Sequence, residues 1–375
     1  MDALDVAIKK SGADAFVLYA SSDDADIRYL TRFVIHDPFV FFKRVGQPGT
    51  IIVSQMECER ASRESIAAVM TRTQAGLPDI LKTEKNPWKA LAQMIAGQAG
   101  KTLLVSQNFP AALVRALEEH ARVVVDYGTV EQMRAKKSTH EIALMKNVQK
   151  NTQDAMALAC SLIQQSTIKK GMLYYESAPL TSEYVRTAVH KYLMDRGCRA
   201  VETIISCGND TALPHAIGSG QLAAHEPIVI DMFPKDEATG YFADMTRTVS
   251  KGEPDDRIVE MYDAVLGAKH LAISRIKPGV SGSDVYQVVV DFFADRGYES
   301  TTRGFVHNLG HGVGLQVHEL PTLGAAGSTL KAGNVITVEP GLYYPGTGGV
   351  RLEDMGVITR QGFSGFTHFP EELIV

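Results

Sequence analysis

The feature that most constrains this chain is a pair of aspartates in one strand-turn-strand stretch, DMFPKDEATGYFADMTRT, from Asp231 to Thr248. The strand before the turn is apolar on both faces except at Asp231, and the strand after it, Tyr241 to Val249, carries Asp244. Because side chains alternate with a period of two, we expect both aspartates on one face. Two carboxylates in an apolar strand pair repel each other and are poorly solvated, so the arrangement requires a cation or a proton between them.

Three later segments supply further metal-binding side chains. The histidines of HNLGHGVGLQVHE, from His307 to Glu319, lie among glycines, which argues against a helix and favours a loop followed by a strand. Asn334 to Gly341 alternates as a strand that ends at Glu339, and Val350 to Ile358 alternates as one further strand. With the aspartate pair, the candidate metal ligands are Asp231, Asp244, His311, Glu339 and Glu353.

The composition of this ligand set indicates a catalytic metal centre. Four carboxylates and one imidazole suit two adjacent divalent ions of the manganese, cobalt or zinc type, whereas a structural zinc site would use cysteines. Two such ions lower the pKa of a shared water towards about 7, so that hydroxide is available at neutral pH.

The motifs together resemble the pita-bread metallopeptidases, the family of methionine aminopeptidase, aminopeptidase P, proline dipeptidase and the metal-free creatinase. The resemblance covers residues 130 to 375 and is carried by PHAIGS (Pro214 to Ser219), GYFADMTRT, HNLGHGVG with VHE, TVEPGLY and VRLED. It implies a creatinase-like α/β N-terminal domain, residues 1–130, and an α+β pita-bread catalytic domain, residues 131–375. The second domain is expected to hold a curved antiparallel sheet covered by helices, with pseudo-twofold symmetry.

The resemblance also implies a role for each site residue. Asp231 binds one ion, Asp244 and Glu353 bridge both, and His311 and Glu339 bind the other; Glu339 is also the expected proton acceptor. His307 and His318 are candidate donors to the oxyanion, and the expected substrate-binding residues are His215, His318 and Arg351. A supporting role behind the ligands is the alternative for the three histidines His215, His307 and His318.

The expected activity is hydrolysis of the Xaa-Pro bond at the N-terminus of short peptides by a Xaa-Pro dipeptidase. Aminopeptidase P activity on longer peptides is the alternative, and a non-catalytic binding protein on the same fold is the alternative of another class. We also expect a homodimer, in which the N-terminal domain covers and shapes the active site.

The rest of the sequence excludes several protein classes. A net charge of -5 gives no indication of nucleic-acid binding, and no apolar run approaches the roughly 18 residues of a membrane span. The first residues are acidic where a secretory signal is basic, so we expect a cytoplasmic protein without membrane contact. Four cysteines without CxxC spacing are expected to be reduced thiols.

Local patterns place the domain boundary and several elements. Ser138 to Glu141 reads as a capping box that opens a long amphipathic helix, Ile142 to Leu162, and the boundary is expected just before it. We also expect a helix from Glu57 to Met70 and an irregular connection from Ile168 to Leu180.

Overall fold

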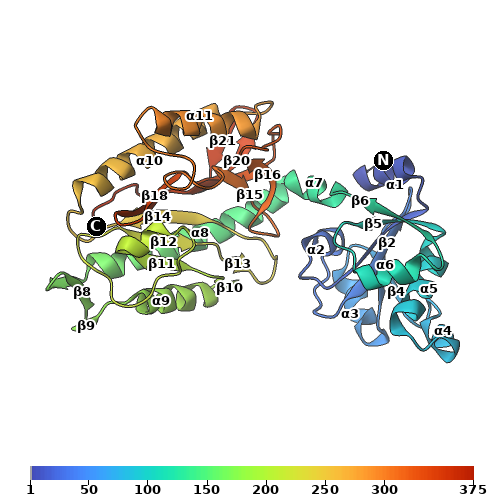
Figure 1. Ribbon diagram of the computed structural model, residues 1–375. Coiled ribbons are helices and arrows are strands. Elements are labelled where there is room, and N and C mark those ends of the chain that lie inside the picture. Colours follow the sequence, from blue (N-terminus) through green and yellow to red (C-terminus); the bar gives the residue numbers. More distant parts are fainter. Residues whose placement is uncertain (1) are drawn as a thin grey trace. The chain divides into compact units, whose positions relative to one another are not determined.

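The computed structural model describes residues 2–375 and divides after Arg134 into two compact units (Figure 1). The N-terminal unit ends at Arg134, and the C-terminal unit runs from Ala135 to Val375. Within residues 2–375, no helix combines the length and apolar character needed to cross a membrane. All four cysteines are free thiols.

The N-terminal unit is built on a mixed six-stranded sheet in the order β4-β3-β2-β1-β5-β6. Along β1, Val17 packs on one face of the sheet and Phe16 on the other, so apolar clusters cover both faces and an α/β layer structure results. Its strands are β1 (Ala15–Ala20), β2 (Phe39–Arg44), β3 (Thr50–Val53), β4 (Ala68–Thr71), β5 (Thr102–Ser106) and β6 (Arg122–Asp126). Its helices are α1 (Ala3–Ser11), α2 (Ala25–Thr31), the 3-10 turn η1 (Gln55–Glu57), α3 (Cys58–Glu64), α4 (Leu77–Thr83), α5 (Pro87–Ala99), α6 (Ala111–Leu117) and α7 (Thr129–Ala135).

The C-terminal unit contains four long helices and several antiparallel sheets. The helices are α8 (Thr139–Gln164), α9 (Ser182–Met194), α10 (Asp256–Arg275) and α11 (Gly282–Ala294), with the 3-10 turn η2 (Gly208–Ala212). The strands of its first half are β7 (Thr167–Lys169), β8 (Met172–Tyr175), β9 (Ala178–Pro179), β10 (Cys198–Arg199), β11 (Ile204–Cys207), β12 (Ile228–Met232), β13 (Lys235–Asp236) and β14 (Met245–Val249). Those of its second half are β15 (Gly310–Gly312), β16 (Glu319–Leu323), β17 (Val335–Val338), β18 (Gly341–Tyr344), β19 (Gly348–Arg351), β20 (Asp354–Thr359) and β21 (Gly362–Gly365).

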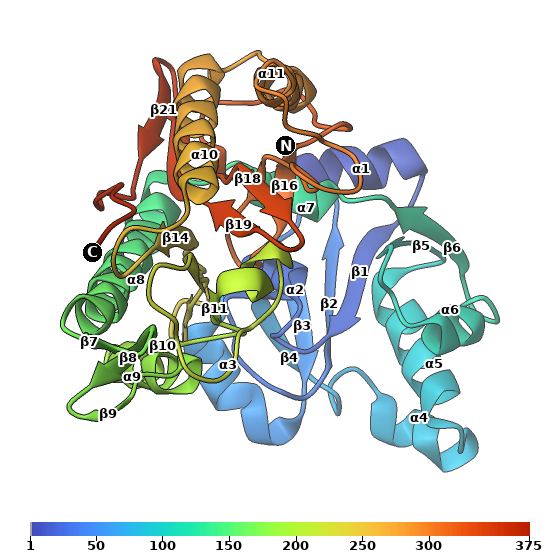
Figure 2. The same cartoon turned by 60° about the vertical axis from the view of Figure 1, so that its left-hand side comes forward.

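A helix pair followed by an antiparallel sheet occurs twice in this unit. Helices α8 and α9 precede the β11-β12-β14 sheet, and α10 and α11 precede the β16-β15-β17-β20-β21 sheet. In Figures 1 and 2, α10 and α11 lie on one side of these strands and α8 and α9 on the other. The apolar faces of α10 and α11 pack on the second sheet and form one buried apolar cluster with it.

The start of α8 confirms the predicted capping box. The Ser138 hydroxyl accepts the Glu141 N–H at 3.3 Å, and the Glu141 carboxylate accepts the Ser138 N–H at 2.7 Å. These two bonds satisfy N–H groups that have no partner within the helix, so the helix begins where the sequence predicts.

Two predicted boundaries outside the site are wrong. The helix predicted from Glu57 to Met70 ends at Glu64, because the chain turns extended at Ser65 and pairs with β3 as the edge strand β4. The segment from Ile168 to Leu180 is not irregular but forms the small β7-β8-β9 sheet. In both places the backbone pairing with a neighbouring strand outweighs the local pattern.

Two predicted strands within the catalytic unit also differ from the structure. The strand predicted from Tyr241 to Val249 begins only at Met245. The segment from Val350 to Ile358 is two strands, because β19 pairs with β18 and β20 pairs with β17. The chain changes its partner strand between Arg351 and Asp354. The two-residue alternation of side chains in the sequence gives no signal of this change.

A buried cationic side chain links α10 to the strands of the second half. Lys269 is fully buried and its ammonium lies 2.6 Å from the Asp354 carboxylate and 2.5 Å from that of Glu371. Asp354 also pairs with Arg247 at 2.9 Å. Burial opposes the charge of Glu371, but the hydrogen bond and charge of Lys269 lower the pKa of Glu371 below its ordinary value.

We predict that Glu371→Gln destabilises the protein by about 1 kcal/mol at neutral pH and by less at acid pH. Because the pKa of Glu371 is lowered in the folded state, its contribution is present above the ordinary carboxyl pKa and is lost as the pH falls through and below that value. Urea unfolding of wild type and variant between pH 3 and pH 7 measures this difference. A gap between the two proteins that is constant over this range contradicts the prediction.

Candidate metal centre

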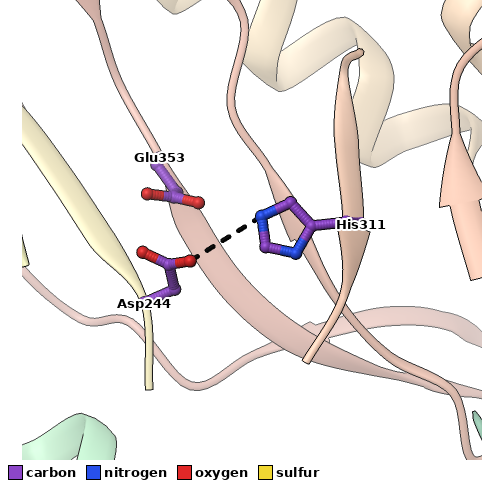
Figure 3. Close-up of side chains that lie close together, drawn as sticks. All are labelled: Asp244, His311 and Glu353. Atoms are coloured by element: carbon purple, nitrogen blue, oxygen red, sulfur yellow. Dashed lines mark ion pairs between the residues drawn. The ribbon is translucent and has the colours of Figure 1, made fainter. Parts of the chain in front are cut away.

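The five predicted ligands come from five separate segments of the C-terminal unit. Asp231 lies in β12, Asp244 directly before β14, His311 in β15, Glu339 directly after β17, and Glu353 between β19 and β20. Ligand atoms of Asp244, His311 and Glu353 all lie within 4.8 Å of one another, and Figure 3 shows the three side chains pointing towards one another. The His311 Nε2 atom is 3.7 Å from the Asp244 carboxylate and 3.3 Å from the Glu339 carboxylate.

Strand register places the two aspartates close together. Asp231 of β12 pairs with Thr246 of β14, and Asp244 stands two residues before Thr246 on the same face. The structure thus brings the two carboxylates together, as the alternation predicts, although Asp244 itself precedes the strand.

Glycines allow the backbone around His311 to approach its neighbours closely. A Cβ atom at Gly310 would lie 2.2 Å from the Thr337 carbonyl oxygen, and one at Gly312 would lie 2.2 Å from that of Leu320. Only glycine permits these contacts, which set β15 tightly between β16 and β17. The glycines therefore explain how a histidine in this segment reaches the carboxylates.

The charges of the cluster are unfavourable without a cation. Burial and the neighbouring carboxylates of Glu353, Asp231 and Glu339 raise the pKa of Asp244 well above its ordinary value. Burial, with the charges of Glu339 and Asp231, raises the pKa of Glu353 to about 8. A bound divalent ion would remove the reason for both shifts, because it compensates the carboxylate charges directly.

Glu339 and His311 form an ion pair across the cluster. Burial opposes the charge on each, but the hydrogen bond between them lowers the pKa of Glu339 to about 2 and raises the pKa of His311 to about 9. A metal ion must displace the His311 proton in order to bind its nitrogen, so metal binding releases a proton at neutral pH.

Two observations show that the residues present fit a metal. The Oδ1 atom of Asp231 is buried and has no hydrogen-bond partner among residues 2–375, although a buried carboxylate oxygen ordinarily has one. His311 Nδ1 lies 3.0 Å from the Gly312 carbonyl oxygen, so the N–H at that position directs Nε2 towards the carboxylates. The cluster thus presents free acceptor atoms of the kind that hard divalent ions prefer.

Arg351 is held among polar groups beside Asp231. Its guanidinium donates to the Asp231 carboxylate at 2.7 Å and to the Tyr343 hydroxyl at 2.9 Å, and the residue is only 4% exposed. It also donates to the Pro214 carbonyl oxygen at 3.2 Å. In this structure the side chain therefore orients a ligand, and its donors do not face solvent.

The three predicted histidines have different surroundings. His307 Nε2 lies 2.9 Å from the Tyr343 hydroxyl and Nδ1 lies 2.7 Å from the Asn308 carbonyl oxygen, so both ring nitrogens have partners. His318 is exposed, stacks edge-on against His311 at 4.4 Å between ring centres, and makes no hydrogen bond among residues 2–375. Burial and His311, with a smaller effect of His215, lower the pKa of His318, which places His215 within electrostatic reach.

Three further residues contact the site, although the sequence analysis did not assign them to it. Thr246 donates to the Glu353 carboxylate at 2.9 Å, and Tyr343 joins Arg351 to His307. Gln149 of α8 accepts the Asp244 N–H at 3.3 Å. The alternation of β14 places Thr246 on the face of Asp244, whereas nothing in the sequence relates Gln149 to a strand nearly a hundred residues away.

Comparison with known proteins identifies the family that this centre belongs to. The family model of metallopeptidase family M24 matches residues 143–360. This chain belongs to metallopeptidase family M24. The match includes all five predicted ligands, and family membership makes the protein a metal-dependent peptidase. The recognition made from the sequence motifs is confirmed.

Relatives of the M24 family match the chain in sequence and in structure. The uncharacterized peptidase YqhT of Bacillus subtilis (strain 168) is 34% identical over 69% of this chain and 70% of its own length. The prolidase from Pyrococcus horikoshii OT3 matches with a TM-score of 0.84 and 26% identity, covering 99% of each chain. The X-Pro aminopeptidase from Thermotoga maritima MSB8 matches with a TM-score of 0.79 and 26% identity, covering 97% of this chain and 98% of its own. These matches over the full chain confirm the predicted fold class, an α/β N-terminal part and an α+β pita-bread part.

We predict that Asp244→Ala lowers the metal content of the purified protein. Removing this carboxylate takes away a ligand at the centre of the cluster and part of the negative charge that holds a cation. Metal per chain is measured by elemental analysis after loading with Mn²⁺ and desalting. Glu237→Ala, an exposed acid in the same stretch, is the matched control and should keep the wild-type content. Equal metal content in all three proteins contradicts the assignment.

Proposed function

We propose that the protein hydrolyses the Xaa-Pro bond of short peptides as a Xaa-Pro dipeptidase, with two divalent metal ions in the described centre. The observation that carries this proposal is the buried set of four carboxylates and one imidazole, whose charges require cations. In it, Asp231 would hold one ion, His311 and Glu339 would hold the other, and Asp244 and Glu353 would be shared between the two. The solved relatives named prolidase and X-Pro aminopeptidase support the proline specificity.

The protein's own groups divide the work of the reaction. When bound, the metal ions polarise the scissile carbonyl and lower the pKa of water. The Glu339 carboxylate lies 3.3 Å from the His311 Nε2 atom, beside the cluster of carboxylates, and we assign it as the acceptor of the proton from the attacking water. Its Oε1 atom then returns the proton to the leaving nitrogen of proline.

His318 is the better placed of the two candidate donors to the oxyanion. Its ring is exposed and has no hydrogen-bond partner within residues 2–375, so it is available to a substrate carbonyl beside His311. Arg351 donates to the Tyr343 hydroxyl, which leaves that hydroxyl's own hydrogen for His307 Nε2. We therefore assign His318 to the substrate and His307 to the support of Tyr343.

Substrate selection rests on shape for proline and on charge for peptide length. A Xaa-Pro bond has no N–H, so the proline ring is recognised by apolar contact. The carboxylate of a dipeptide lies beside the reacting bond, where the exposed imidazoles of His215 and His318 are the candidate hydrogen-bond donors. Arg351 contributes indirectly, through Asp231, because its guanidinium is already bonded.

Three further expectations stay predictions under this proposal. They are manganese, cobalt or zinc as the metal, assembly as a homodimer, and a cytoplasmic location. Activity on longer peptides is the second candidate function, supported by the relative named X-Pro aminopeptidase.

We predict that chelation abolishes activity and that Mn²⁺, Co²⁺ or Zn²⁺ restores it.

We further predict that Ala-Pro is cleaved at least about 5-fold faster than Ala-Pro-Ala. A tripeptide presents a neutral amide in place of this carboxylate, so the imidazole donors lose a charged hydrogen-bond partner, at a cost of about 1 to 3 kcal/mol. The measurement is kcat/KM under identical metal conditions, with Ala-Ala as the control for proline. Faster cleavage of Ala-Pro-Ala assigns the aminopeptidase activity, and faster cleavage of Ala-Ala removes the proline specificity. Full activity without metal, or metal binding with no peptide cleavage, contradicts the proposed function.

We predict that His318→Ala reduces kcat by roughly 100-fold or more while the metal content stays at the wild-type value, because one transition-state donor is lost. His307→Ala should have the smaller effect on kcat, since this ring is bonded to Tyr343 and the Asn308 carbonyl. Steady-state kinetics and elemental analysis of both variants test the assignment. The opposite order of effects, or loss of metal from His318→Ala, shows that the assignment is wrong.

A further inference from the structure

An ion pair that none of the proposed chemistry uses lies next to the metal centre. The Lys137 ammonium, just before α8, is 3.0 Å from the Glu319 carboxylate, and both side chains are only 1% exposed. Burying two charges carries a large desolvation penalty, so such a pair is weak evidence for stability by itself. Its surroundings indicate what else it does.

The Glu319 carboxylate packs inside the turn that carries His318, residues 314–319. Its Oε1 atom accepts the Gln316 N–H at 3.1 Å, while Oε2 takes the bond from Lys137. A Cβ atom at Gly314 would lie 2.5 Å from this carboxylate, so the turn closes directly onto it. The position of the turn therefore depends on where Lys137 holds the carboxylate.

The same turn contacts the segment that leads to Asp244. The Gly314 carbonyl oxygen accepts the Phe242 N–H at 2.8 Å, two residues before Asp244. The adjacent Tyr241 hydroxyl donates to the Glu141 carboxylate at 2.7 Å, near the start of α8. The start of α8, the turn and the aspartate segment thus form a closed set of contacts.

Backbone bonds fix the position of Lys137 itself. Its N–H donates to the Gly333 carbonyl oxygen at 2.9 Å, and the preceding Lys136 bridges to Asn334, directly before β17. The ammonium therefore reaches Glu319 from a backbone that is anchored beside the strand leading to Glu339.

We propose that Lys137 and Glu319 are positioning residues for the catalytic centre: their buried ion pair holds the turn of residues 314–319 so that His318 and Asp244 keep their places around the metals. Neither residue is one of the five candidate metal ligands. The role of the pair in placing His318 rests on the proposed function, because its test is peptide cleavage. Its role in placing Asp244 is tested by the affinity for metal, which requires no peptide cleavage.

The test separates positioning from stability with two variants. Lys137→Met leaves the Glu319 charge buried without this cation, so its Tm should fall by several degrees. The double variant Lys137→Met with Glu319→Gln removes both charges and should recover most of that Tm. If the pair positions the centre, the double variant still loses about 10-fold or more in Mn²⁺ affinity and in kcat/KM on Ala-Pro, because the contacts that place Asp244 and His318 are lost. Affinity is measured by competition with a fluorescent chelator, well below the Tm.

Lys43→Met is the matched control. It breaks another buried lysine pair, with Asp5 at 3.1 Å in the N-terminal unit, and should lower the Tm without changing Mn²⁺ affinity. Wild-type Mn²⁺ affinity and kcat/KM in the folded double variant overturn the inference. If that variant does not fold, Glu319→Asp, which keeps the charge and shortens its reach, replaces it, and wild-type values there overturn the inference equally. A wild-type protein that binds Mn²⁺ but cleaves no peptide contradicts only the proposed function, and the affinity comparison still decides the role of the pair.

Discussion

The main constraint on the C-terminal unit is a group of carboxylates that the fold holds together away from water, although their charges repel one another. Asp231, Asp244 and Glu353 are at most 8% exposed, and the Glu339 carboxylate lies 3.3 Å from the Nε2 atom of His311. In water these groups would separate, but strands fixed by backbone hydrogen bonds and apolar packing prevent it. Burial and the neighbouring carboxylates raise the pKa of Asp244 and of Glu353, and divalent cations bound among these groups would compensate their charges.

Around this cluster, neighbouring groups restrain the ligands individually. Arg351 holds one oxygen of Asp231, Thr246 holds one of Glu353, and the Gly312 carbonyl lies against Nδ1 of His311. In each case the partner binds one atom of the ligand and leaves another directed into the cluster. This arrangement explains how a site built from distant segments keeps the orientation that metal binding needs.

The polar groups beyond the ligands fall into two kinds. Buried cations such as Lys269 and Lys137 pair with acids and connect the strands to α10 and to the start of α8. His215 and His318, by contrast, are exposed and within electrostatic reach of each other. The buried pairs thus join separate segments of the unit, whereas the two exposed imidazoles are the groups to which the proposed function assigns the substrate.

By itself, the sequence determined which side chains are candidate metal ligands, the shared face of the aspartates and the capping box that opens α8, because these follow from side-chain type and short-range periodicity. The tertiary structure decided which partner each group has: Arg351 binds Asp231, His307 is held by Tyr343, and the strand predicted through Glu353 divides between two sheets. Such pairings join residues far apart in the chain. They depend on how strands and helices pack in three dimensions, and no local pattern of residues encodes that packing.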